Sequence, residues 1–264
     1  MMTSTSTYEV GMSRMWAVGI DEAGRGPVIG PLVVAAVRVP ESDVELLVSN
    51  GVTDSKLLSA TRRQEIAAWL YEEAQERNWG VAVHSSSPWM IDVAMQATNL
   101  NDHEVEIFAS LARSVTPPNV RADGGILQLD ACDINTRRFG NNVASRISSW
   151  PWQDWTIASE HGADLSMPAV GAASIIAKVA RDEAIDALSV KMGMDLGSGY
   201  PSDPLTIAAI PELLSGNEPH DALRWRWATV EEAWMKLHGI EPPTRQAQAG
   251  GTGLGGGQSR LELF

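Results

Sequence analysis

The chain of 264 residues can form one large domain or a domain with an appendage, and its hydrophobic content of 44% is enough for a substantial core. Its single cysteine, Cys132, excludes an internal disulfide and a multi-cysteine zinc site. A net charge of −13 argues against a broad basic surface and, taken alone, favours a small-molecule enzyme or a protein of a salty cytoplasm. The sequence shows no signal peptide and no apolar run of about 18 residues, so we expect a cytoplasmic protein.

Two acidic residues and a glycine-flanked arginine lie between two apolar, β-like segments near the N-terminus. Asp21 and Glu22 end the first segment, and the turn Gly24-Arg25-Gly26 leads into the second. Carboxylates bind hard metal ions, and backbone amides made accessible by glycine bind phosphate or sugar hydroxyls. The pattern therefore predicts an active-site edge, with an ordinary hairpin and polar turn as the alternative.

The middle of the chain alternates helical and strand-like segments. Ser59 can cap a helix in which apolar residues recur at helical spacing. A strand is expected at 79–85, and a long helix at 88–114 that Pro117 and Pro118 close. Two short buried strands are expected at 126–130 and 155–158. Strands separated by helices predict a mixed sheet covered by helices.

The clearest helix covers 171–187, where an apolar face lies opposite a charged one. A tryptophan-rich helical region follows, and then a segment dominated by Gly, Gln and Pro. We therefore divide the chain into a flexible N-terminal tail (1–15), an α/β catalytic domain (16–203), a C-terminal helical extension (204–240) and a flexible tail (241–264).

Four acidic residues from three segments could hold metal ions: Asp21, Glu22, Asp130 and Asp164. Phosphodiester cleavage with two metals requires several carboxylates around ions roughly 4 Å apart, and Mg²⁺ prefers such oxygen ligands. Neighbouring side chains on a regular strand point to opposite faces, so Asp21 and Glu22 can share the site only if the strand breaks there. Gly24 makes that break credible. Each acid alone could instead be a solvated or capping residue. Two divalent ions would return about four positive charges to this acidic chain.

The segment 16–37 resembles the N-terminal signature of archaeal ribonuclease HII, and further blocks follow in family order: Thr53-Asp54-Ser55-Lys56, Leu129 to Asp133, Glu160 to Asp164, Ala172 to Asp182 and Gly197 to Pro204. The resemblance implies a ribonuclease H-like α/β fold, with a five-stranded mixed sheet flanked by helices and a C-terminal helical extension. It also implies Asp21, Glu22, Asp130 and Asp164 as the metal-binding quartet for two Mg²⁺ or Mn²⁺ ions. The implied activity is endonucleolytic cleavage of RNA/DNA hybrids, or 5′ of ribonucleotides embedded in duplex DNA, leaving 5′-phosphate ends.

Substrate contacts are expected from the turn and from basic residues. By the resemblance, Gly24, Arg25 and Gly26 recognise the ribose 2′-hydroxyl, the group that distinguishes RNA from DNA, and Tyr200 packs on the following deoxyribose. Phosphate contacts are expected from Lys56, Lys178 and Arg181. The alternatives are an exposed polar helix face for Lys178 and Arg181, and a turn aromatic that covers the core for Tyr200.

Other polar residues are kept out of the catalytic set. We expect Asp133 to be a turn or cap residue, Asp182 an ion-pair or capping group, and His161 a structural histidine that could also assist proton transfer. In the segment Arg224-Trp225-Arg226-Trp227, basic and aromatic residues alternate as in single-strand binders, but we expect a core tryptophan and surface arginines.

The C-terminal residues Gln258, Leu261 and Phe264 are spaced as in the peptides that bind the sliding clamp. The alternative is a plain disordered terminus. For the whole protein, a non-catalytic hybrid- or clamp-binding protein is the second hypothesis, and we expect a monomer. A helicase is excluded by the lack of a phosphate-binding loop, and a dehydrogenase by the lack of the Gly-x-Gly-x-x-Gly spacing.

Overall fold

The two apolar segments at the start of the chain form the centre of the sheet. In the computed structural model, which describes residues 15–53, 55–246 and 262–263, they are β1 (Trp16–Ala23) and β2 (Leu32–Pro40). The two strands pair antiparallel, with Asp21 opposite Ala35. Both strands are covered on both faces, which explains why their sequences are nearly continuous runs of apolar residues.

Further strands extend the sheet on both sides of this pair. β3 (Gly80–Ser86) pairs antiparallel with β2, while β4 (Gly125–Asp130) pairs parallel with β1 and β5 (Trp155–Glu160) pairs parallel with β4. The two-residue β6 (Glu262–Leu263) pairs with β3, so the strand order is β5-β4-β1-β2-β3-β6. The predicted mixed five-stranded sheet is confirmed, and β6 adds a short sixth strand at its edge.

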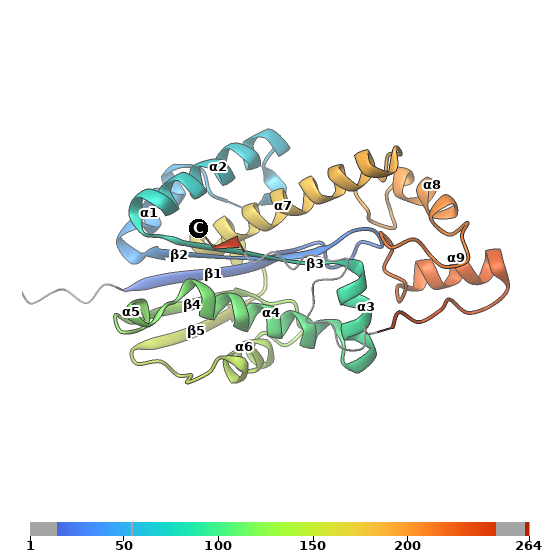
Figure 1. Ribbon diagram of the computed structural model, residues 1–264. Coiled ribbons are helices and arrows are strands. Elements are labelled where there is room, and N and C mark those ends of the chain that lie inside the picture. The colour runs from blue at the N-terminus through green and yellow to red at the C-terminus, as the bar shows by residue number, and fades with distance from the viewer. Residues whose placement is uncertain (1–14, 54, 247–261, 264) are drawn as a thin grey trace, which may run out of the picture.

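Helices cover both faces of the sheet (Figure 1). α4 (Leu100–Val115) and α6 (Thr136–Arg146) enclose one core, in which Phe108 packs edge-to-face on Phe139. α2 (Ala60–Arg77) and α7 (Pro168–Met192) enclose the core on the other face. The shorter helical elements are η1 (Glu41–Asp43), α1 (Val44–Ser49), η2 (Ser55–Leu57), α3 (Pro88–Ala97), α5 (Pro118–Arg121), η3 (Ala163–Leu165), α8 (Pro204–Leu213) and α9 (Ala228–His238).

A glycine allows α7 to approach the sheet closely. A Cβ atom at Gly19 would lie 2.0 Å from the backbone of Ala169, so any side chain there would push the helix away from β1. The first turns of α7 therefore lie directly against β1. This contact brings Ser174 to the strand end where Asp21 lies.

The predicted helix at 88–114 is two helices. Asn99 interrupts it in an extended conformation, and its side chain accepts a hydrogen bond from the backbone N–H of Asp102 at 3.0 Å. An asparagine that caps a helix start satisfies an N–H group that has no partner within the helix. This local gain favours the start of a new helix over a continuous one.

The C-terminal helical extension is also less regular than predicted, because α8 and α9 are separated by an irregular segment at 214–227. A third core lies here, where Val28 and Ile29 of the N-terminal turn pack with residues such as Leu223 and Trp234. The expected boundary at residue 240 is too early. Arg245 is buried and donates to Asp92 of α3, so the chain packs on the domain as far as the structure follows it there. Within the described residues, no helix is long and apolar enough to span a membrane.

Candidate active site

Asp21 and Asp130 lie side by side at one edge of the sheet. β1 and β4 run parallel with Ile20 in register with Leu129, so the next residue of each strand is an aspartate. Asp21 is buried, and burial raises the pKa of its carboxyl well above the usual range, with further increases from the charges of Glu22 and Asp130. The hydroxyl of Ser174 donates a hydrogen bond to it and opposes this rise.

β1 continues without a break to Ala23, so the side chains of Asp21 and Glu22 leave it on opposite faces, yet their carboxyls come close enough to share a hydrogen bond. The break that we expected near Gly24 is therefore absent at the two acids. Asp21 faces Ser174 of α7, whereas Glu22 lies near Glu104 of α4. Both nevertheless interact electrostatically with Asp130, whose charge raises the pKa of each. Burial and Asp130 together raise the pKa of Glu22 to about 7.

Asp164 reaches the same edge through a tight turn. Gly162 adopts a φ of +64°, and the N–H of Ala163 donates to Oδ1 of Asp130 at 3.1 Å. Asp164 is the next residue, and it is buried in η3. The turn thus ties the segment that carries Asp164 directly to the Asp130 carboxylate, and β1, β4 and η3 bring their acids to one region.

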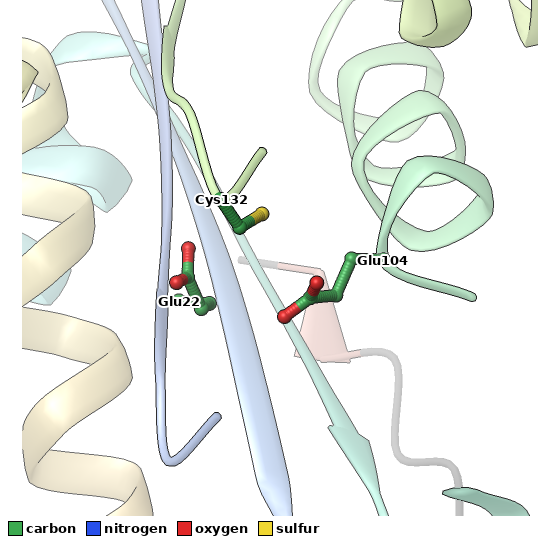
Figure 2. Close-up of side chains that lie close together, drawn as sticks. All are labelled: Glu22, Glu104 and Cys132. Carbon is green, nitrogen blue, oxygen red and sulfur yellow. The ribbon is translucent and has the colours of Figure 1, made fainter. Parts of the chain in front are cut away.

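A second group of potential ligands lies beside Glu22. Ligand atoms of Glu22, Glu104 and Cys132 are all within 4.8 Å of one another, and Figure 2 shows Glu104 reaching from α4 toward the other two. Burial raises the pKa of the Cys132 thiol, so it is neutral. Glu104 is 0% exposed and forms an ion pair with Arg25, which also donates to Asn101. The arginine therefore compensates a carboxylate that is shut off from water.

We did not expect Glu104 at the site, although the sequence contains a signal for it. It lies four residues before Phe108 and three before Ile107, on the apolar face of an amphipathic helix. An acid at such a position is rarely left without a partner. Its partner, Arg25, is 79 residues away in the chain, so only the fold identifies it.

The turn Gly24-Arg25-Gly26 lies next to Tyr200. A Cβ atom at Gly26 would lie 3.5 Å from Cε1 of the Tyr200 ring, and Gly24 has a φ of +90°. Arg181 is 1% exposed, stacks below the Tyr200 ring and donates to the Ser198 carbonyl at 2.7 Å. This buried placement suits support of Tyr200 and not the expected direct contact with phosphate.

The two predicted phosphate-binding lysines lie on neighbouring elements. Lys178 of α7 pairs with Asp182 at 2.6 Å and is partly exposed, and Lys56 is exposed in η2. η2 contacts α7 through the Ser55 and Ser174 hydroxyls, whose oxygens are 3.0 Å apart. Ser174 thus connects the lysine-bearing segment to Asp21.

The polar residues that we left out of the catalytic set have structural contacts. Asp133 accepts from the N–H of Asn135 and pairs with Arg138, as expected of a turn residue. Asp182 forms the expected ion pairs, with Lys178 and with Arg63. The Nε2 atom of His161 is hydrogen-bonded to the Asp133 carbonyl at 2.8 Å. These contacts fit structural roles.

The prediction of surface arginines in the segment 224–227 is wrong for Arg224. Trp225 is buried as expected and Arg226 is exposed, but Arg224 is 0% exposed and donates to carbonyls of the N-terminal turn. The segment is not helical, so the burial of its residues cannot be predicted from the faces of a helix. The predicted clamp-binding residues Gln258, Leu261 and Phe264 lie outside the described residues.

The donor set fits hard divalent cations. Asp21, Glu22 and Asp130 lie at one strand edge and Asp164 lies in the adjoining η3, burial and repulsion from Asp130 raise the pKa of Asp21 and Glu22, and Oε2 of Glu22 is buried without a hydrogen-bond partner. Divalent ions bound to oxygen ligands would relieve both the repulsion and the missing partner. An acid-lined edge on a mixed sheet of this topology is typical of the metal-dependent nucleases of the ribonuclease H type.

Comparison with known proteins agrees with this class. The family model for ribonuclease HII matches residues 18–230. The chain is 46% identical over 192 residues to ribonuclease HII of Methanocella arvoryzae, covering 72% of this chain and 79% of that one. It is 41% identical to ribonuclease HII of Thermococcus sibiricus, covering 83% of this chain and 91% of that one.

Solved structures give the same result. The crystal structure of ribonuclease H2 from Pyrococcus horikoshii OT3 matches with a TM-score of 0.71 at 32% identity, covering 84% of this chain and 99% of that one. The structure of the PCNA:RNase HII complex from Archaeoglobus fulgidus matches with a TM-score of 0.69 at 36% identity, and the match covers 82% of this chain and 96% of that one. The chain belongs to the ribonuclease HII family, and it is a metal-dependent endonuclease that acts on RNA/DNA hybrids.

Proposed function

We propose that this enzyme cuts the RNA strand of hybrids and also cuts 5′ of single ribonucleotides embedded in duplex DNA, with two divalent ions held by Asp21, Glu22, Asp130 and Asp164. The observation that supports this proposal most is the pairing of Asp21 and Asp130 at the ends of adjacent strands, with η3 bonded to Asp130 and with a glycine-rich turn that lies against Tyr200. Removal of ribonucleotides from DNA and processing of RNA primers are the cellular roles that we infer from it.

The proposed reaction is hydrolysis of the phosphodiester bond. A water oxygen attacks the phosphorus, the bond from phosphorus to the 3′-oxygen breaks, and that oxygen takes up a proton, which gives a 3′-hydroxyl and a 5′-phosphate. Mg²⁺ or Mn²⁺ would lower the pKa of the attacking water and stabilise the leaving oxygen. The carboxylates of Asp21 and Asp130 supply oxygen ligands from adjacent strands, and Ser174 orients Asp21.

Recognition of substrate is assigned to the turn and to Tyr200. Backbone amides of Gly24-Arg25-Gly26 can hydrogen-bond to a ribose 2′-hydroxyl, and the ring of Tyr200, which lies against Gly26, can pack on the next sugar. Lys56 and Lys178 are proposed to contact phosphates, where they position the duplex without reading bases. These local positive charges allow a chain with a net charge of −13 to bind nucleic acid.

The test is cleavage of a DNA duplex that carries one ribonucleotide, with and without Mg²⁺, beside an all-DNA duplex of the same sequence. We expect a single cut 5′ of the ribonucleotide only when Mg²⁺ is present, and no cut in the all-DNA duplex. Product ends are identified by ligation. The cut strand should be ligated as it stands and should no longer be ligated after the 5′-phosphate is removed. Binding without cleavage by a folded sample would contradict the proposal and favour a non-catalytic hybrid-binding protein.

We also propose that the C-terminal residues Gln258, Leu261 and Phe264 bind the sliding clamp. Support comes from their spacing and from the clamp complex formed by the related Archaeoglobus fulgidus protein. Truncation before Gln258 is expected to weaken clamp binding at least about tenfold, since the apolar anchors are lost, while cleavage without the clamp stays unchanged. Surface plasmon resonance on immobilised clamp measures the clamp affinity, and a gel assay measures cleavage without the clamp. Equal clamp affinity of both chains would contradict the assignment.

A further inference from the structure

We propose that Arg224 is a positioning residue for substrate recognition, which fixes the peptide groups of the turn Gly24-Arg25-Gly26 so that their free amides face the ribose. The inference rests on the proposed function, in which this turn recognises the 2′-hydroxyl. It adds to that function a residue from the C-terminal extension, about 200 positions away in the chain.

The guanidinium of Arg224 holds three main-chain carbonyls at once. Its Nη2 donates to the Gly24 carbonyl at 2.6 Å, its Nη1 to the Arg25 carbonyl at 2.9 Å, and its Nε to the Gly30 carbonyl at 3.0 Å. The side chain is 0% exposed, so these bonds do not compete with water. A planar group with a fixed fork of donors holds its acceptors in one relative geometry.

Trp227 extends this contact by one residue. Its indole N–H donates to the Gly26 carbonyl at 3.3 Å, and its ring stacks on the Arg224 guanidinium, 4.9 Å from the ring centroid to Cζ. Three successive carbonyls, those of Gly24, Arg25 and Gly26, are therefore bound by one pair of side chains. This arrangement places the oxygen side of the turn toward the C-terminal extension.

The direction of the carbonyls determines the direction of the amides. In a planar trans peptide group the N–H points opposite to the C=O, so the N–H groups of Arg25 and Gly26 point away from Arg224. Among the residues that the structure describes, neither N–H donates a hydrogen bond. Pro27 follows and has no N–H, so the turn offers these two donors, beside the ring of Tyr200.

Arg224 is itself firmly placed. Its N–H donates to the Val28 carbonyl at 2.9 Å, and the next two N–H groups, of Trp225 and Arg226, donate to the buried carboxylate of Asp92 at 2.9 and 3.3 Å. Arg226 provides a matched control, since it lies in the same segment but its side chain is 46% exposed and its ion pair with Glu231 is long, at 3.9 Å.

The experiment compares the full-length chain with the Arg224→Lys and Arg226→Lys variants. Fluorescence anisotropy in EDTA gives the Kd for a duplex with one ribonucleotide and for the all-DNA duplex, and the ratio of the two is the ribonucleotide preference. Lysine keeps the charge but cannot hold three carbonyls, so Arg224→Lys is expected to reduce this preference about tenfold and to raise KM more than it lowers kcat. Arg226→Lys should leave the preference unchanged.

Two further measurements separate positioning from a general structural role. Mn²⁺ binding by calorimetry should be unchanged in Arg224→Lys, because the acids lie on β1, β4 and η3, whereas general loosening would weaken it. If Arg224→Lys does not fold, Trp227→Phe removes the donor to the Gly26 carbonyl while keeping an aromatic side chain at this position, and we expect about a threefold loss of preference. A folded variant that keeps the wild-type preference overturns the inference alone. A wild-type chain without any preference overturns the proposed function and the inference with it.

Discussion

Replacing Asp21 with asparagine is expected to reduce cleavage of a ribonucleotide-containing duplex at least about 100-fold while binding of the same duplex is retained. Changing a residue that only orients a metal ligand costs about 10- to 100-fold, and a direct ligand should cost more. Asn keeps the shape of the side chain but supplies a neutral oxygen in place of a carboxylate. The hydrogen bond from Ser174 can still form, so the fold should be preserved.

The measurement is single-turnover cleavage at saturating enzyme, combined with anisotropy for binding and thermal melting for folding. Glu160→Gln is the control, because Glu160 ends β5 in register with Asp130 and its side chain is exposed. Its rate should remain within about twofold of the wild type, as for a surface change. Unchanged turnover of the Asp21 variant would remove Asp21 from the site.

The stability of the metal-free protein is expected to carry a pH dependence that comes from Glu22. Its folded pKa is about 7, against a usual value of 4.5. Between these values the folded state binds more protons at this site than the unfolded state, so its contribution to stability is complete below about pH 4.5 and is lost as the pH rises through 7. Burial of Asp21 acts in the same direction.

A variant isolates this contribution from that of other groups. Burial lowers the pKa of His103 to about 4, and this works in the opposite direction over part of the same pH range. The difference in unfolding free energy between the wild type and Glu22→Gln cancels the histidine contribution and should decrease from pH 4.5 to 7 in EDTA. Urea unfolding at a series of pH values provides it. A difference that does not change with pH would contradict a raised pKa of Glu22 in the folded protein.

Divalent cations should reverse this loss. At pH 8, Mn²⁺ at 100 times its Kd is expected to stabilise the wild type by about 2.7 kcal/mol, because it binds the folded state alone. The gain should be smaller in Glu22→Gln at the same Mn²⁺ concentration. Equal stabilisation of the two chains would place the ions elsewhere.

Sequence by itself determined the strands and the family. β1 and β2 are continuous apolar runs, α2 begins at the Ser59 cap, and β4 ends in Asp130, so local pattern and local chemistry are sufficient for each. A shared location of the acids at strand ends could be predicted from the sequence, because parallel neighbouring strands end at the same edge of a sheet. The broken helix at Asn99 was the exception, since a cap in the middle of a long periodic pattern is a weak signal.

Tertiary structure alone decided how the two sides of the site are divided and what holds the turn. Asp21 faces α7 while Glu22 faces α4, since β1 stays regular through both. Glu104 pairs with Arg25 of the turn although it is 79 residues away in the chain. Arg224 binds the Gly24 carbonyl from about 200 residues away. The buried environment that pairs Glu104 with Arg25 and Arg224 with three carbonyls is created by packing between distant segments. No local periodicity encodes such contacts, because the cost of burying a charge is set by whichever groups the completed fold brings to it.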